Sequence, residues 1–424
     1  MTFNVIETFS GIGSQVKALD RIKQREPNFD YNIVATVEWE VGAMYAYDII
    51  HNGKQDLSKY ANLTKEQLCQ NLSKYNLSSD GKKPLSEEAL KRMPLNQLKA
   101  ICHSIDRNNN LVDISTVHAW DLPKADLLTY SFPCQDLSIS SYWHKNFSGI
   151  DRDSNNRSSL LWEIERILKE YDENDLQKPR YLLMENVTAI KSPRNVDNFN
   201  IWKEQLQSMG YKNYAELDLN AKNFGIPQNR VRTYMLSILA DDNWNDIYNY
   251  LDNSDINKVN EAPDIEPFLR LDYSNETYRN EAIESTPNWT TSRKTIHDDS
   301  CILADGIITN GFLAKTITTK QDRNPNAGLI LHGLDLPSHK APYRNLTPRE
   351  AFLLMGFDEY DYDALMENNI PITNNRKILS NSKLLKLAGN SIVVNVLEEI
   401  FAKMYYINQH FFKHDNIIPF KRTV

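Results

Sequence analysis

Cys134 stands in the part of the sequence that most favours chemistry. It follows Pro133 at the end of the apolar run 127–132, a position that presents a side chain at the rim of a sheet. A thiol has an ordinary pKa of about 8.5, so a nucleophilic cysteine needs nearby cations or a helix N-terminus. The polar segment 138–157 comes next and is typical of a loop that closes over a substrate. These features alone fit a catalytic cysteine and a buried structural one equally.

A carboxylate and two guanidinium groups are expected near the same rim. Glu185 ends the apolar run 181–184, where a carboxylate is costly unless it is paired or in use. Capping of a helix by the adjacent Asn186 is the structural alternative. Arg230 and Arg232 begin a later strand and share a face, because strand residues two apart point the same way. The arginines could orient Glu185, contact a phosphate or stabilise a thiolate.

A glycine turn after the first expected strand indicates a nucleoside-containing cofactor. The segment 9–13 (Phe-Ser-Gly-Ile-Gly) precedes a helix, and its glycines let the backbone approach a ligand closely. Glu38 ends the second expected strand and can accept both ribose hydroxyls of an adenosine. Gln15 and Val16 stand where a dinucleotide motif has its third glycine, which favours a nucleoside without a pyrophosphate, such as S-adenosylmethionine. A structural tight turn is the alternative.

Alternating strands and helices would bring these segments to one sheet edge. Strands are expected at 3–9, 32–37, 127–132, 181–184 and 233–238, and helices at 15–25, 160–171 and 393–406. This alternation indicates an α/β fold with a doubly wound, mostly parallel sheet. Residues 52–110 read as a helical insertion, with helices at 65–73 and 86–104, and a surface elaboration is favoured over a functional role. The expected domains are 1–239 plus 381–424, and a smaller irregular domain at 240–380.

Taken in order, these segments resemble the motifs of the C5-cytosine DNA methyltransferases of bacterial restriction-modification systems. The resemblance runs from residue 3 to about 401, excluding 52–110 and most of 240–310. It also covers Asp113-Ile114, Gln228 beside the two arginines, the segment 344–350 and the segment 389–392. One departure concerns the loop after the cysteine, where Ser140-Ser141 stand in place of the family's usual glycine and the next glycine is Gly149.

The resemblance implies a Rossmann-like domain that binds S-adenosylmethionine and a smaller target-recognition domain. The implied catalytic residues are Pro133, Cys134, Glu185, Arg230 and Arg232. The implied cofactor-binding residues are Phe9, Ser10, Gly11, Ile12, Gly13, Glu38, Trp39, Asp113, Ile114, Leu160, Asn390, Ser391 and Ile392. The expected DNA-binding residues are Gln135, Ser138, Arg157, Thr316, Lys320 and Arg323, with Gln321 and Asn324 as further candidates.

In the implied mechanism the Cys134 thiolate adds to C6 of cytosine and thereby activates C5. Glu185 would hold N3 and the amino group, while Arg230 and Arg232 position the base and its phosphate. The target base must flip out of the duplex, at a cost of a few kcal/mol. Gln135 and the loop 138–157 would fill the vacated space. The product is S-adenosylhomocysteine, and no metal is expected.

Composition sets limits on the partners. The net charge of -8 counts against nucleic acid, but residues 290–349 hold eight basic and five acidic residues, a local balance of +3. The four cysteines are widely spaced, so neither a zinc site nor a disulfide framework is expected. No membrane span or secretory signal is visible, and a cytoplasmic monomer is expected. Double-stranded DNA is the expected partner, together with a possible cognate restriction endonuclease.

Two rival functions remain at this stage. A tRNA cytosine-5 methyltransferase would share the catalytic motifs, but it has a short recognition region with a Cys-Phe-Thr segment, which this sequence lacks. A non-catalytic DNA-binding regulator would have lost Cys134 or Glu185, and both are present. The recognition half shares no clear similarity with enzymes of defined specificity, so no target sequence is predicted.

Overall fold

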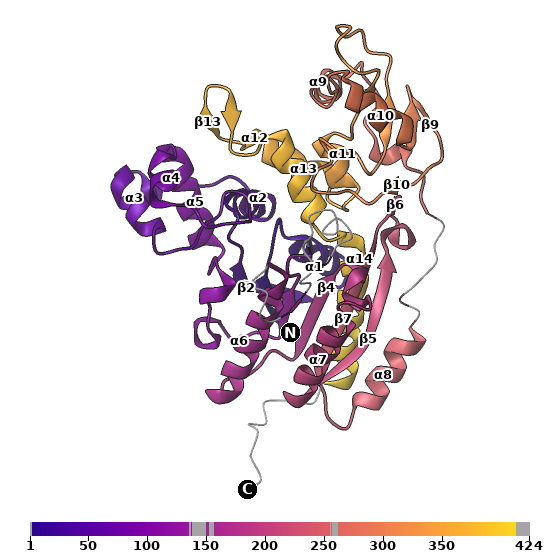
Figure 1. The fold of residues 1–424 in the computed structure, drawn as a ribbon. Helices are drawn as coiled ribbons and strands as arrows, with labels where there is room; N and C mark the ends of the chain where they lie inside the picture. The colour runs from indigo at the N-terminus through magenta and orange to yellow at the C-terminus, as the bar shows by residue number, and fades with distance from the viewer. Residues whose placement is uncertain are drawn as a thin grey trace.

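A mixed six-stranded sheet forms the centre of the fold (Figure 1). The computed structural model describes residues 2–134, 137, 150–151, 157–254, 256 and 262–412. In spatial order the strands are β2 (Asp30–Val37), β1 (Thr2–Thr8), β3 (Leu127–Tyr130), β4 (Tyr181–Asn186), β7 (Val231–Leu239) and β5 (Tyr211–Asn220). The first four strands are parallel, whereas β7 is antiparallel to β4 and β5. The expected α/β fold with a mostly parallel sheet is confirmed, although strand β5 was not foreseen.

Both faces of the sheet are buried. Successive strand residues point to opposite faces, and the apolar side chains on each face are covered by helices. Val5 packs in one apolar cluster and Ile6 in the other, and Leu183 and Leu182 divide in the same way. The first face is covered by α1 (Ser14–Arg25) and α14 (Val394–Phe411), which pack against each other. The second is covered by α6 (Leu161–Glu173) and α7 (Val196–Ser208). This two-sided burial explains why the strands read as nearly continuous apolar runs.

The strand order reverses at the centre of the sheet, where a ligand site is expected. β1 pairs with β2 on one side and with β3 on the other, and Thr8 at its end lies opposite both Val37 and Tyr130. The turn after β1 and the Pro133-Cys134 segment after β3 therefore emerge side by side at the carboxyl ends of adjacent strands. In open α/β sheets this switch point is where ligands bind.

The expected helical insertion lies between β2 and β3. After α2 (Val41–Asn52) it contains α3 (Lys65–Leu72), α4 (Glu87–Arg92) and α5 (Leu95–Arg107). The single helix expected at 86–104 is wrong. Met93 has an extended backbone before Pro94, because a proline disfavours the helical conformation of the residue that precedes it.

The recognition side is built from short elements above the sheet edge (Figure 1). Its helices are α9 (Glu276–Glu284), α10 (Thr291–Asp299), α11 (Pro348–Leu353) and α12 (Glu359–Glu367), and α13 (Asn381–Asn390) follows it at the start of the final segment of the chain. Its strands are β8 (Ile302–Asp305), β9 (Ile308–Thr309), β10 (Ala314–Lys315), β11 (Leu329–Leu331), β12 (Tyr343–Arg344), β13 (Pro371–Thr373) and β14 (Arg376–Lys377). β10 pairs with β6 (Gln228–Asn229), which directly precedes β7. This pairing joins the recognition side to the central sheet.

The boundary at 240 stays a prediction. The helix that follows it, α8 (Trp244–Asn253), packs against β5 and α14 of the sheet half. Asn243 Nδ2 donates to the carbonyl oxygen of Phe411 at 3.0 Å, and the rings of Tyr250 and Tyr406 stack with centroids 4.3 Å apart. We therefore place α8 with the sheet half.

Candidate active site

One continuous cavity of about 890 Å³ opens at the carboxyl ends of the central strands. The recognition side closes it with residues 316–319, and the end of the chain closes it with 386–392. The expected site residues that line it are Phe9, Ser10, Gly11, Ile12, Glu38, Trp39, Asp113, Ile114, Pro133, Cys134, Leu160, Glu185, Arg230, Arg232, Thr316, Asn390, Ser391 and Ile392. Side chains expected to bind a cofactor and side chains expected to react therefore share one space.

The turn after β1 has the shape of a ligand cradle. Gly11 and Gly13 have φ values of 56° and 79°, which favour glycine. A side chain on Gly13 would meet the His51 ring, since its Cβ would lie 2.1 Å from Nε2. The Gly11 amide donates to Glu38 Oε2 at 3.0 Å, which ties the turn to the end of β2. Gly13 thus supports the cradle from behind and is not itself on the cavity wall.

Two carboxylates on the cavity can accept hydrogen bonds. Burial raises the pKa of Glu38 to about 7, and the Glu40 amide opposes this shift by donating to Oε1 at 2.7 Å. Asp113 accepts from the Ser115 amide at 3.0 Å and from Asn76 Nδ2 at 2.8 Å. Each carboxylate oxygen has two lone pairs, so both groups retain capacity for a ligand.

Cys134 is half-buried at the end of β3. Its backbone is held on both sides: Ser158 Oγ donates to the Pro133 carbonyl at 2.7 Å, and the Leu137 amide donates to the Cys134 carbonyl at 3.0 Å. Burial raises the pKa of the thiol, and Arg232 partly offsets this. The expected cations are therefore in place, but desolvation outweighs them when no substrate is bound.

Glu185 and Arg232 form the charged pair facing the thiol. Arg232 Nε lies 3.4 Å from Glu185 Oε1, and both side chains are mostly buried. Burial raises the pKa of Glu185, while Arg232 and Arg230 lower it. The helix cap proposed for Asn186 is wrong: its Nδ2 donates to the Phe132 carbonyl at 3.0 Å and joins β4 to the cysteine segment.

Arg230 differs from the expectation that both arginines contact substrate. It precedes β7, is 4 % exposed, and its Nη atoms donate to the carbonyls of Ile317, Gly389 and Ser391 at 3.0, 3.1 and 2.8 Å. These carbonyls engage both Nη atoms, whereas Nε has no hydrogen-bond partner among the described residues. Burial lowers the pKa of Arg230 to about 9. Arg230 therefore joins the recognition side to the last glycine turn.

The expected DNA-binding residues divide into three groups. Thr316 lies on the cavity and donates from Oγ1 to the Asn229 carbonyl at 2.9 Å. Lys320 and Arg323 are exposed next to it but do not line the cavity. Gln135 and Ser138 lie outside the described residues, as does the side chain of Arg157.

The further candidates Asn324 and Gln321 also differ from each other. Asn324 is exposed and lines the cavity. Gln321 is fully buried, and its Oε1 accepts from the Ala327 amide at 3.3 Å. Its role as a base reader is wrong, because a side chain that braces its own loop is not presented to DNA.

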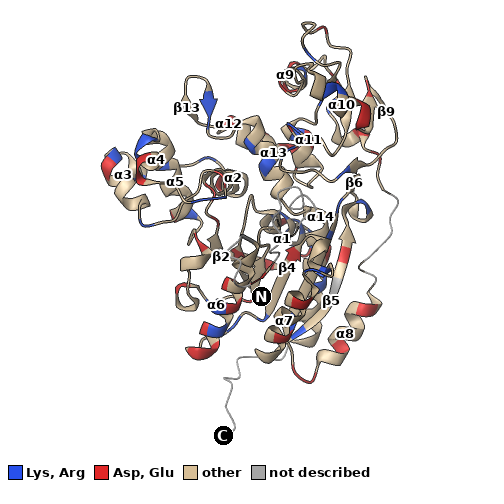
Figure 2. Cartoon of the chain, viewed as in Figure 1, with Lys and Arg blue, Asp and Glu red and all other residues tan. Residues whose placement is uncertain are grey.

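Charge is distributed unevenly over the fold (Figure 2). Acidic segments mark α6, α7 and α8 in the lower part of the view, whereas basic segments lie in the upper part, on α13, near β6 and on β14, which pairs with β13. The net charge of -8 is therefore compatible with a basic contact face.

The cavity residues that the sequence analysis did not name include the charged side chains of Glu40, Asp80 and Lys386, together with Gly81. Glu40 could have been suspected, because it directly follows Glu38-Trp39. Asp80 and Gly81 belong to the insertion, so its interpretation as a surface elaboration is wrong at this point. Within the described ranges we find no cluster of three or more His, Cys, Asp or Glu side chains able to hold a metal, and no helix suited to crossing a membrane.

The known proteins to which this chain is similar are methyltransferases. The family described as C-5 cytosine-specific DNA methylase matches residues 96–406. The orphan methyltransferase M.SssI of Spiroplasma monobiae is 34 % identical over 411 residues, covering 94 % of this chain and 96 % of that protein. The type II methyltransferase M2.ScrFI of Lactococcus lactis subsp. cremoris is 32 % identical over 403 residues, covering 95 % and 98 %.

A solved structure shows the same fold at lower similarity. The Dnmt2 methyltransferase of S. pombe has a TM-score of 0.56 and 18 % identity, covering 97 % of this chain and 100 % of that chain. This likeness extends to the fold alone.

Proposed function

The chain belongs to the family of C-5 cytosine-specific DNA methylases, and we propose that Cys134, Glu185 and Arg232 carry its reaction. It is a DNA (cytosine-5)-methyltransferase. The observation that carries the residue assignment is the single cavity in which the thiol, the carboxyl group and the glycine turn meet. The rival tRNA enzyme is set aside, because both near-full-length relatives are named among the orphan and type II methyltransferases.

The residues around the turn fit S-adenosylmethionine. Gly11 provides a close backbone approach, and Glu38 and Asp113 provide acceptors for ribose hydroxyls and an adenine amino group. Asn390 and Ser391 close the opposite wall. When bound, S-adenosylmethionine supplies an electrophilic methyl group.

The three catalytic side chains have separate tasks. The Cys134 sulfur forms a bond to C6 of cytosine, which pushes the ring electron pair toward C5 and N3. Glu185 keeps its proton to a higher pH than an ordinary glutamate, so it can donate that proton to N3 as negative charge develops there. Arg232 holds the Glu185 carboxyl group in place. After C5 is substituted, loss of its proton breaks the S–C6 bond and frees the thiolate.

The target cytosine must leave the helix, because its C5 and C6 atoms are enclosed in a stacked duplex. Thr316 and Asn324 line the cavity from the recognition side and are our candidates for contacts to the flipped nucleotide. We further propose that the protein acts as a monomer, since residues of one chain complete the cavity, and that it acts in the cytoplasm, which is consistent with a DNA substrate. The relatives' names support either a solitary enzyme or one with a cognate restriction endonuclease.

Methyl transfer to DNA from tritium-labelled S-adenosylmethionine tests this assignment. Cys134→Ala should abolish labelling, while the matched control Cys301→Ala, which removes a half-buried thiol outside the main cavity, should retain it. DNA carrying 5-fluorocytosine should trap the wild-type protein covalently, since the C5 proton can no longer be lost. Label in adenine, or undiminished labelling by Cys134→Ala, would overturn the mechanism. Bisulfite sequencing of the product then gives the target sequence.

A further inference from the structure

The insertion segment 76–81, between α3 and α4, contacts three parts of the expected cofactor pocket: the end of β2, Asp113 and Lys386. Its Asp80 and Gly81 line the same cavity as Cys134 and the glycine turn. The helices around it belong to an insertion that the catalytic motifs do not include. A surface elaboration has no reason to enter the active cavity, so these contacts need an explanation.

The segment is attached first to the end of β2. The Ser78 amide donates to the Trp39 carbonyl at 2.8 Å, and the Val41 amide donates to the Ser78 carbonyl at 2.8 Å. These two bonds flank Glu40 and form a short parallel bridge. The backbone that carries Glu38 and Trp39 is thus paired directly with the insertion.

Lys386 of α13 attaches the segment a second time. Its ammonium group donates to the Asp80 carbonyl at 2.6 Å and to Glu40 Oε2 at 2.6 Å. Both Glu40 and Lys386 line the cavity, and α13 leads into the turn of Asn390 and Ser391. One cation therefore joins three walls of the pocket: the end of β2, the insertion and the end of the chain.

A third hydrogen bond joins the segment to Asp113. Asn76 Nδ2 donates to Asp113 Oδ2 at 2.8 Å, and Asp113 is the acceptor assigned to the adenine amino group. An amide that holds one carboxylate oxygen limits the directions in which the group can accept a ligand.

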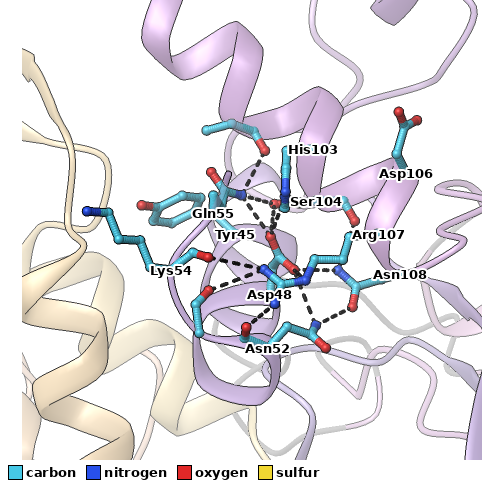
Figure 3. A network of polar contacts seen from close by, with 12 residues as sticks. Tyr45, Asp48, Asn52, Lys54, Gln55, His103, Ser104, Asp106, Arg107 and Asn108 are labelled. Atoms are coloured by element: carbon cyan, nitrogen blue, oxygen red, sulfur yellow. Dashed lines mark hydrogen bonds and ion pairs between the residues drawn. The ribbon is translucent and has the colours of Figure 1, made fainter. Parts of the chain in front are cut away.

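The insertion is itself braced from behind (Figure 3). Asp48 of α2 is fully buried and accepts from Asn52, Gln55 and Asn108 at 3.2, 2.8 and 3.1 Å. His103 Nδ1 of α5 lies 3.1 Å from Asp48 Oδ2. This network fixes α5, and the insertion with it, to the helix that starts next to Glu40.

Glu40, which lines the cavity beside residues 76–81, provides independent evidence that a ligand binds here. The residue is 5 % exposed, and its Oε1 has no hydrogen-bond partner among the described residues. A buried acceptor without a donor is costly, so a donor from a bound molecule belongs here. The cofactor's hydroxyl and ammonium groups are such donors.

We propose that residues 76–81, clamped by Lys386, form a wall of the S-adenosylmethionine site and set its affinity. This inference rests on the proposed cofactor site. Lys386 and Asn76 act as positioning residues: Lys386 holds the wall closed, and Asn76 orients Asp113.

Binding of S-adenosylhomocysteine to the full-length chain, measured by titration calorimetry, tests the proposal. Lys386→Met should weaken binding about fivefold or more, since it removes a charged donor from two acceptors. Lys386→Arg, which can still donate to both, should restore binding to within about twofold. Lys82→Met removes an exposed lysine from the same loop and should bind normally. Lys82→Met should also keep its DNA affinity and kcat within about twofold. In Lys386→Met the KM for S-adenosylmethionine should rise by a larger factor than kcat falls, and the affinity for DNA should change less than the affinity for S-adenosylhomocysteine.

Asn76→Ala provides a second test at an exposed position, where misfolding is not expected. It should weaken S-adenosylhomocysteine about twofold to fivefold, but leave an analogue with oxygen in place of the adenine amino group unaffected. A purely structural asparagine would weaken both ligands equally.

Three outcomes would overturn the inference: wild-type affinity in both Lys386→Met and Asn76→Ala, equal loss of DNA and cofactor binding in Lys386→Met, or equal weakening of both ligands in Asn76→Ala. If the unaltered chain binds no cofactor and methylates no DNA, the proposed function itself fails.

Discussion

Replacement of Arg230 by methionine should show whether this side chain stabilises the structure of the site or takes part in the reaction. The side chain donates to three backbone carbonyls on two segments, at Ile317 of the recognition side and at Gly389 and Ser391 of the last turn. A methionine fills a similar volume and donates nothing. The carbonyls then lose their donor in a largely dry environment.

The size of the effect follows from those contacts. A buried acceptor without a donor costs about 1–3 kcal/mol, and three of them sum to several kcal/mol. Removal of a buried cation offsets part of this loss of stability, because the guanidinium no longer has to be desolvated. We expect a net loss of ~3–5 kcal/mol in the free energy of unfolding, which is typical of a mutation that breaks a buried hydrogen-bond network. The free energy of unfolding of Arg230→Lys should lie between those of the wild type and Arg230→Met, since an ammonium group lacks the planar geometry with which arginine reaches all three carbonyls.

Urea unfolding together with separate titrations of S-adenosylhomocysteine and DNA provides the assay. Arg230→Met should lower the unfolding midpoint and weaken both ligands, because Ile317 and Ser391 line one cavity from opposite sides. Arg232→Met is the matched comparison: its Nε pairs with Glu185 at 3.4 Å, so it should lower kcat more than stability. An Arg230→Met protein with the wild-type midpoint, slope and affinities would refute this reasoning.

Other predictions address the thiol, a buried acid and a crowded glycine. Since burial raises the pKa of the Cys134 thiol, alkylation of Cys134 by iodoacetamide should become faster as the pH rises through and beyond about 8.5, and a Cys134 alkylation rate that is flat from neutral to alkaline pH would contradict this. Burial raises the pKa of Glu7 from 4.5 to about 8, so folding favours its protonated form; its stabilising contribution is complete below pH 4.5 and is lost as the pH rises toward 8. Glu7→Gln should remove that part of the slope in urea unfolding, and an unchanged slope would rule out Glu7 as its source. A Cβ on Gly389 would lie 2.5 Å from the Thr318 carbonyl carbon, so Gly389→Ala should weaken DNA and cofactor binding, whereas Gly333→Ala, with open space around it, should not; equal affinities would show that the two segments can separate without cost.

Local pattern was sufficient for much of the fold. Strands β1, β3 and β4 follow from the expected strands at 3–9, 127–132 and 181–184, and they end at Thr8, Tyr130 and Asn186; α1 follows from its apolar spacing. β5 was missed although Gly210 precedes it, because polar residues interrupt its sequence, 211–220, so that it lacks the continuous apolar run that marked the other strands. The break at Pro94 was overlooked because amphipathic spacing continues across it.

The sequence alone determined which side chains could react. Cys134 and the glycine turn follow strands and Glu185 is near the end of one, and the ends of neighbouring parallel strands must meet at one edge of a sheet. That consequence depends on chain order and strand direction, which are readable from local pattern. The resemblance to a known family added the order of the motifs.

Only the tertiary structure decided how the arginines and the insertion are used. Arg230 and Arg232 are two residues apart, yet one binds carbonyls from residues far along the chain and the other pairs with Glu185. Likewise, nothing near Asp80 in the sequence indicates that Lys386 will bind its carbonyl and bring it to the cavity. The partners in such contacts are set by the packing of distant segments, and local spacing carries no information about which segments will meet.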